Sequence, residues 1–329
     1  MEQQYNRRNR TDNTEKRIQY IRRTDENFPG RMIHLKGMPG GLYLIGKLPE
    51  EGRPSVAIVG SRRSSAYGNE TARMFARELA GAGVQIISGM AWGIDGMAHE
   101  GALEVGGDTF AVLGCGVDVC YPAGNRKLYE KICAHGGVLS ELAPGMPPMP
   151  GHFPARNRII SALSDLVLVV EAKEKSGSLI TADCALEQGK DVYAVPGRLG
   201  DELSRGCLDL IRQGAGLADS PRSILQALGI QEPVHQKHTK ILLAKDENIV
   251  YSWIRLQPMT LDELIKRTEF PVHKIVPLLV GLELKGCIRE VRKNEYVRTD
   301  LRTTNGEISG DSGVTCKGED NQEIFGCEL

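Results

Sequence analysis

The run Val56-Ala-Ile-Val59, followed directly by Gly60-Ser61-Arg62-Arg63, is the stretch that indicates the fold. A short apolar run that ends in glycine is typical of a strand buried on both faces of a parallel sheet. Similar runs follow along the chain, at Val84–Ile87, Phe110–Leu113, Val138–Leu139, Leu166–Val170 and Val192–Val195. Helical patterns separate these runs, so we predict an α/β domain with a mostly parallel sheet and helices on both faces.

This Rossmann-like domain is predicted to span residues 29–230. Residues 1–28 are predicted to be a basic flexible arm, because the first 23 residues hold seven basic and three acidic side chains and no apolar periodicity. A polar linker over 231–247 and a flexible tail over 299–329 are predicted from their polar composition.

Residues 248–298 are predicted to form a small winged-helix-like domain. Thr260-Leu-Asp-Glu263 is a capping box that opens one helix, and a second helix is expected over Pro271–Lys285. Pro277 lies inside that second helix and removes a backbone donor, so we expect a kink and leave DNA binding by this domain open. A hairpin is expected to follow, with strands at Cys287–Arg292 and Tyr296–Arg298.

The composition limits the class of protein. The net charge is −1, so any affinity for nucleic acid has to come from local clusters of Lys and Arg. The sequence has no signal-peptide pattern and no apolar run of about 18 residues, so we expect a cytoplasmic protein without membrane contact. The 8 cysteines form no CxxC or His/Cys zinc spacing, so we expect reduced thiols, no metal and no other cofactor.

Glycine, serine and basic residues recur just after the predicted strands. The loops are Gly60–Arg63, Ser88–Gly93, Gly114–Gly116, Lys173–Ser178 and Pro196–Arg198. In an open parallel sheet, ligands bind beyond the carboxyl ends of the strands, where helix N-termini favour anions. Each loop alone is equally compatible with an ordinary tight turn, but together they favour a phosphate site.

Missing motifs narrow the choice of phosphate ligand. No GxGxxG dinucleotide fingerprint and no GxxxxGK[ST] P-loop occurs, which disfavours NAD binding and P-loop ATPase chemistry. A nucleotide, a sugar phosphate and a nucleic-acid backbone remain as candidates.

The segment Gly151-His-Phe-Pro-Ala-Arg-Asn-Arg158 is the most informative of these stretches. Arg156 and Arg158 can pair bidentately with phosphate, and Phe153 can stack on a base. The alternatives are a core contact for Phe153 and ion pairs with Asp or Glu for the arginines. We favour phosphate, because cations at the start of a helix oppose its dipole unless an anion is present.

Acidic residues and one histidine lie near the same loops. Asp95 and His99 are four residues apart on one helical face, and Glu141 and Glu171 follow predicted strands. Each could serve in acid–base chemistry or hold a metal, but no third ligand is evident. We therefore expect these side chains to make structural hydrogen bonds.

Six motifs, in this order along the chain, resemble the DNA-processing protein A (DprA/Smf) family. They are Gly60–Arg62, Ser88–His99, Tyr121-Pro122, Phe153–Ile160, Glu171–Thr181 and Ala194–Gly197. The resemblance covers residues 29–230 and implies a non-catalytic protein that binds single-stranded DNA without sequence specificity in natural transformation or recombination. It also implies loading of the RecA recombinase onto that strand and a homodimer formed through the Rossmann-like domain.

The resemblance further implies which residues bind DNA. The pocket is expected to be lined by Arg62, Phe153, Arg156, Asn157 and Arg158. Backbone amides are expected from two loops, Gly60-Ser61 and Ser88-Gly89. The rim is expected to be extended by Lys173, Lys175, Ser176 and Gly177. Many members carry a lysine where this chain has Pro150, so one phosphate contact is expected to be missing or to come from Lys173.

Two other functions stay open at this point. One is a nucleoside-monophosphate phosphoribohydrolase-like enzyme on a related fold, although its Gly-Gly-x-Gly-Thr loop is missing and the related place reads Ser176-Gly-Ser-Leu-Ile-Thr181. The other is a winged-helix regulator with a small-ligand sensor domain, against which the modest basic excess of the second domain argues.

Overall fold

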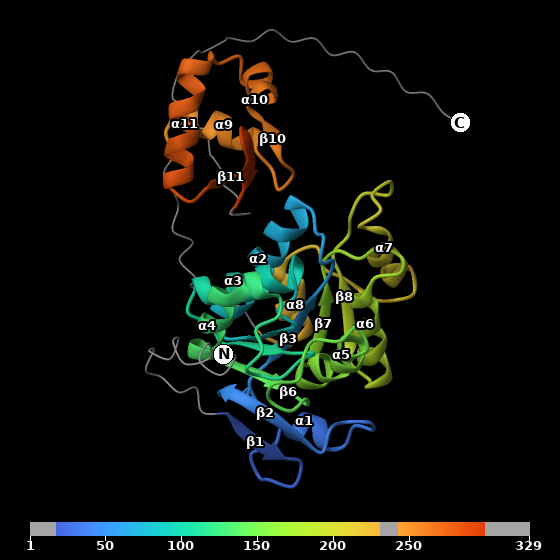
Figure 1. Ribbon diagram of the computed structural model, residues 1–329. Helices are drawn as coiled ribbons and strands as arrows, with labels where there is room; N and C mark the ends of the chain where they lie inside the picture. The colour runs from blue at the N-terminus through green and yellow to red at the C-terminus, as the bar shows by residue number, and fades with distance from the viewer. Residues whose placement is uncertain (1–17, 231–242, 300–329) are drawn as a thin grey trace, which may run out of the picture.

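The computed structural model describes residues 18–230 and 243–299, which form a nine-stranded sheet and a separate three-stranded sheet. Figure 1 shows the large sheet with its helices and, above it in this view, the small C-terminal unit, whose Arg289 pairs with Glu70 of the large unit at 3.1 Å. Most of the predicted arm, linker and tail lies outside the described residues.

The nine-stranded sheet has the order β1-β2-β6-β5-β4-β3-β7-β8-β9, and β3 through β9 run parallel. All six strands predicted from apolar runs are present. Their bounds are Ser55–Val59 (β3), Gln85–Ser88 (β4), Thr109–Val112 (β5), Gly137–Ser140 (β6), Leu166–Val169 (β7) and Asp191–Ala194 (β8), and Gly216–Leu217 adds β9. The chain builds outward from β3 to β6 and then returns to place β7 on the other side of β3, which makes the β3/β7 boundary the switch point of the sheet.

The prediction of a flexible arm over 1–28 is wrong for its last part. Gln19–Arg22 form strand β1, which pairs antiparallel with β2 (Gly41–Gly46), and β2 pairs antiparallel with β6. Ile21 is buried, and the Tyr20 and Tyr43 rings lie 4.6 Å apart across the two strands. Four residues with a single buried side chain give too weak a sequence pattern to predict this strand.

Helices cover both faces of the large sheet, as predicted. One face packs against α1 (Gly30–Ile33), α5 (His152–Leu163), α6 (Gly177–Glu187) and α7 (Arg205–Arg212). The other face packs against α2 (Ala66–Gly81), α3 (Ile94–Glu104), α4 (Arg126–His135) and α8 (Pro221–Ala227). A Rossmann-like architecture follows, with the central strands β3 to β7 buried on both sides.

The C-terminal unit has the helices and hairpin of a winged helix. It contains α9 (Lys245–Trp253), α10 (Leu261–Thr268), α11 (Val272–Leu284) and the strands β10 (Met259–Thr260), β11 (Ile288–Arg292) and β12 (Glu295–Arg298). The predicted capping box forms, because the Glu263 amide donates to the Thr260 hydroxyl and the Glu263 carboxylate accepts from the Thr260 amide. α11 runs through Pro277 as one element.

Helix α9 was not predicted. Its first turn lies inside the segment assigned to the linker, 231–247, and its buried Val250 and Tyr251 join the core of the small unit. Val250 and Tyr251 are the buried apolar side chains of this helix, so the sequence carries only a short apolar stripe there. Within the described parts of the chain, no helix is long and apolar enough to cross a membrane.

Candidate functional site

The loops at the carboxyl edge of the sheet are held in place by contacts that demand glycine. A Cβ atom on Gly89 would stand 2.3 Å from the Arg156 guanidinium, and one on Gly60 would stand 2.6 Å from Ile94. Gly93, which precedes α3, has φ 76° and lies against the carbonyl of Ser61. The loops after β3 and β4 are therefore packed against each other and against α5.

The Arg156 side chain makes its hydrogen bonds inside the protein. It is 4% exposed, and its guanidinium donates 2.9 Å to the carbonyl of Gly89 and also to the carbonyl of Val112. Burial lowers its pKa to about 10. In this structure the side chain ties α5 to the ends of β4 and β5, which favours a supporting role over the direct phosphate contact expected from the sequence.

Two of the expected phosphate-binding amides are also engaged inside the protein. The Gly89 amide donates 3.1 Å to Asp95 Oδ2, and the Ser61 amide donates 2.7 Å to the carbonyl of Glu171. Ser88 is fully buried and its hydroxyl donates 2.6 Å to the carbonyl of Ile58. These small residues shape the edge, and the structure does not leave these three groups free to bind a phosphate.

Arg62 differs from these groups, because it is exposed to solvent above an aromatic ring. Its guanidinium carbon lies 5.0 Å from the centroid of the half-buried Phe153 ring. The Phe153 ring packs against Gly114. The centroids of the Phe153 and Tyr121 rings are 5.5 Å apart, and the angle between the two ring planes is 39°. Within residues 18–230 and 243–299, Arg62 has no carboxylate partner within 4.0 Å, so its charge is available to an anion.

The other residues of the α5 segment make internal contacts. The Asn157 side chain donates 3.1 Å to the carbonyl of Gly177, which joins α5 to the start of α6. Arg158 forms an ion pair with Glu141, which is the alternative that the sequence left open for this arginine. Ser176 caps α6 by accepting from the Ser178 amide.

Lys173 and Lys175 lie on the exposed rim beside the same edge. Lys173 pairs with Glu202 at 2.9 Å, and both side chains are at least half exposed, so the pair is weak and solvent-screened. Lys173 and Lys175 are thus exposed cations on the rim, and a bound phosphate can compete with Glu202 for Lys173.

The candidate acid–base residues make structural hydrogen bonds, as expected. His99 is fully buried beside Thr109, 2.6 Å from its hydroxyl, and burial lowers the histidine pKa to about 3. Glu171 accepts from the Ser65 amide at 2.9 Å and from its hydroxyl, while burial raises the glutamate pKa. No cluster of three or more potential metal ligands occurs among the residues that the structure describes.

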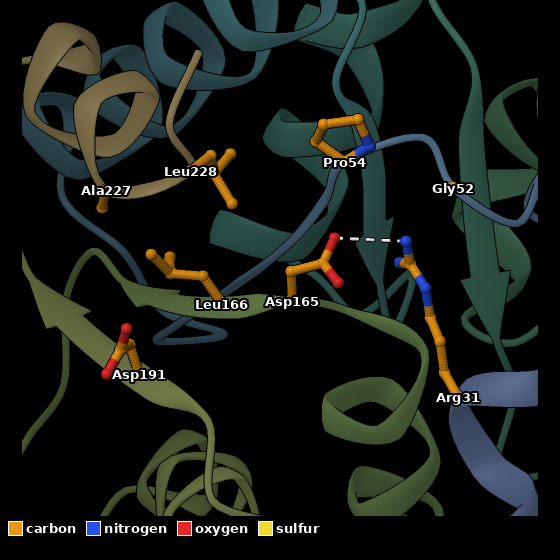
Figure 2. Close-up of a pocket in the computed structure, with 8 residues that line it drawn as sticks. All are labelled: Arg31, Gly52, Pro54, Asp165, Leu166, Asp191, Ala227 and Leu228. Carbon is orange, nitrogen blue, oxygen red and sulfur yellow. Dashed lines mark ion pairs between the residues drawn. The ribbon is translucent and has the colours of Figure 1, made fainter.

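A hollow of about 430 Å³ lies at the opposite edge of the sheet, at the amino ends of β7 and β8 (Figure 2). An ion pair between Arg31 and Asp165, 3.2 Å apart, forms part of its lining. The predicted phosphate residues all lie at the other edge, so this hollow is not the candidate site.

Two exposed aromatic residues at the carboxyl edge were not predicted as site residues. Trp92 is 53% exposed after β4, and Tyr121 is 41% exposed after β5. Both stand inside motifs that were singled out, Ser88–His99 and Tyr121-Pro122. An aromatic side chain in a glycine-rich loop was the signal that could have identified them.

Comparison with known proteins agrees with the fold and with these motifs. Residues 19–229 match the family described as DNA recombination-mediator protein A, and residues 237–292 match the DprA winged helix domain. The protein Smf of Escherichia coli is 39% identical over 282 residues, which are 83% of this chain and 75% of that protein.

Solved structures lead to the same family. The X-ray structure of DNA processing protein A from Streptococcus pneumoniae matches with a TM-score of 0.61 and 42% identity, over 64% of this chain and 74% of that one. The structure of DNA processing protein A from Helicobacter pylori also matches, with a TM-score of 0.58 and 33% identity. That match covers 65% of this chain and 96% of the Helicobacter chain. That study describes a single-stranded DNA binding mode of the Helicobacter protein.

Proposed function

The chain belongs to the DNA recombination-mediator protein A family, and from that premise we propose that it binds single-stranded DNA without sequence specificity at the carboxyl edge of its large sheet. Two relatives carry the name DNA processing protein A, and the one from Helicobacter pylori is described as binding single-stranded DNA.

The observation that carries this proposal is the pairing of Arg62 with Phe153. An exposed guanidinium without a carboxylate partner attracts a phosphate, and the aromatic face 5.0 Å away offers a stacking surface for the attached base. Neither group reads a base edge, so the site is expected to accept any sequence. The paired rings of duplex DNA are stacked on each other and cannot reach Phe153, so unpaired strands are preferred.

Within this proposal, the predicted residues divide into two roles. Arg62 and Phe153 contact the strand, and the rim cations Lys173 and Lys175 add electrostatic attraction together with the α6 start at Ser176-Gly177. The supporting role belongs to residues that fix the loops, namely Gly60, Ser61, Ser88, Gly89, Arg156, Asn157 and Arg158.

We further propose that the bound strand is passed to the RecA recombinase, that the protein acts as a homodimer, and that it has no catalytic activity. The basis for these finer statements is family membership alone. RecA-dependent ATP hydrolysis on limiting single-stranded DNA should rise when substoichiometric protein is added, and sedimentation should give twice the chain mass of 36.0 kDa.

Equilibrium binding to fluorescent oligo(dT), to a mixed-sequence oligonucleotide of the same length and to the matching duplex tests the central proposal. We expect similar affinity for the two single strands and at least tenfold weaker binding of the duplex. Equal affinity for duplex and single strands would contradict the proposal. Release of free base from a nucleoside monophosphate would revive the enzymatic alternative.

A further inference from the structure

Three aromatic side chains share the carboxyl edge of the sheet, although only Phe153 is needed to hold one base. Trp92 follows β4, Tyr121 follows β5 and Phe153 begins α5. Trp92 is 53% exposed and Tyr121 is 41% exposed. Large aromatic surfaces left in water are unfavourable, and their gathering at one edge indicates a ligand that covers them.

Trp92 and Tyr121 are held on one supporting unit. The Trp92 ring lies against Gly124, where a Cβ atom would stand 2.4 Å from Trp92 Cη2. Gly124 belongs to the short helix η1 (Ala123–Asn125), which starts two residues after Tyr121. The Asn125 side chain donates 3.0 Å to the carbonyl of Met90, which ties η1 to the loop that carries Trp92.

Tyr121 also connects this supporting unit to the site proposed above, which contains Phe153 and Arg62. The Tyr121 and Phe153 ring centroids are 5.5 Å apart, and Arg62 lies over Phe153. The spacing between Tyr121 and Phe153 is too small for a base to enter between them, because a stacked ring needs about 3.5 Å on each side. The two rings therefore present neighbouring surfaces, one for each of two successive bases.

We propose that Trp92 and Tyr121 are base-stacking residues, so that the strand runs from Phe153 across Tyr121 toward Trp92 and the site requires a ligand longer than one nucleotide. This inference rests on the proposed function. Neither side chain is charged, so neither can neutralise a phosphate, whereas aromatic faces accept any base. The site thus selects a polymer over a mononucleotide by its row of aromatic faces.

Fluorescence of Trp92 is the direct test. The chain has 2 tryptophans, Trp92 and Trp253, so the full-length Trp253→Phe variant reports Trp92 alone. We expect quenching by oligo(dT) and much less quenching by dTMP or by an abasic strand with the same number of phosphates. Fluorescence anisotropy of a labelled oligo(dT) measures binding independently in the same samples.

Substitutions supply the second readout. Trp92→Ala and Tyr121→Ala should each weaken oligo(dT) binding between about fivefold and a hundredfold and leave the salt slope unchanged, because no phosphate contact is lost. Trp92→Phe should retain most of the affinity, which controls for folding. Tyr20→Ala is the matched control: Tyr20 is 50% exposed on β1, outside the site, and its loss should not change binding.

The outcomes separate this inference from the proposed function. If oligo(dT) binds but Trp92 is not quenched, the inference is wrong and the proposed function stands. If no oligonucleotide binds, the proposed function itself fails. If Trp92→Ala changes the mass of the assembly in solution and not the affinity for DNA, the aromatic row is a contact between protein chains and the inference is overturned.

Discussion

Two arginines at opposite edges of the large sheet differ in how many partners the protein itself gives them. Arg31, at the amino edge, donates to the carbonyls of Leu163 and Arg53 and pairs with Asp165 at 3.2 Å. Arg62, at the carboxyl edge, lies over the Phe153 ring and has no ion pair within the described part of the chain. Only the second guanidinium is left for a ligand.

The number of internal acceptors, and not the residue type or its loop, separates the two arginines. Arg156 follows the same rule, since it lies at the carboxyl edge but donates to two backbone carbonyls and is buried. A buried cation that donates to carbonyls of its own chain ties elements of the fold together, while an exposed one without such acceptors is ready to bind an anion.

The largest expected effect comes from Arg31→Met. The substitution removes the cationic partner of Asp165 and one of the donors to the carbonyls of Leu163 and Arg53, so the free energy of unfolding should fall by about 3 kcal/mol. Urea denaturation measures this fall. Oligo(dT) affinity of the folded variant should equal that of the wild type, and a tenfold loss would break the proposed separation of the two edges.

The next effect concerns His99 and the pH dependence of stability. Burial holds the His99 pKa near 3, below its ordinary value of 6.5, so below pH 6.5 the unfolded chain binds a proton that the folded chain does not. The contribution of neutral His99 to the free energy of unfolding is therefore fully present above pH 6.5 and is lost as the pH falls toward 3. Between pH 7 and pH 5 the loss should be about 2 kcal/mol.

Urea denaturation of His99→Gln at both pH values isolates this contribution. The variant should lose about 2 kcal/mol less than the wild type over the same interval, because glutamine does not titrate. An identical loss in the two proteins would show that His99 is not held neutral beside Thr109.

Phe153→Leu should weaken oligo(dT) binding by about 1 to 2 kcal/mol, because leucine keeps the apolar contact with Gly114 but offers no aromatic face. The salt slope should stay at the wild-type value. A loss confined to the salt slope, measured by titration at several salt concentrations, would mean that the ring only positions Arg62.

The smallest effect is expected at the rim. Glu202→Gln releases Lys173 from its exposed ion pair and should strengthen oligo(dT) binding less than about threefold, and only at low salt. Anisotropy titrations at two salt concentrations measure it. An increase that persists at high salt would indicate that Lys173 is buried against the strand.

Much of the fold could be predicted from the sequence, because strands such as β3 and β7 are short runs buried on both faces. Strand β1 could not be predicted, since its burial depends on pairing with β2 about twenty residues later. Periodicity within a segment carries no information on such a non-local partner.

The candidate site could be predicted only in part. The sequence placed Arg62 and Phe153 at the same edge, and the structure brings them within 5.0 Å. It could not show that Arg156, three residues after Phe153 on the same helix, turns beneath the loops toward Gly89. The rotation of α5 about its axis decides which side chain faces solvent, and packing against the sheet sets that rotation.

The most direct test of the central claim is the salt dependence of oligo(dT) affinity for the wild type, Arg62→Ala and Arg31→Met. For single strands, log K should fall with log salt by about 0.7 for each phosphate neutralised. We predict that Arg62→Ala binds more weakly with a slope shallower by about 0.7, while Arg31→Met keeps the wild-type slope. An unchanged slope and affinity in Arg62→Ala would contradict the assignment of the DNA backbone to the carboxyl edge.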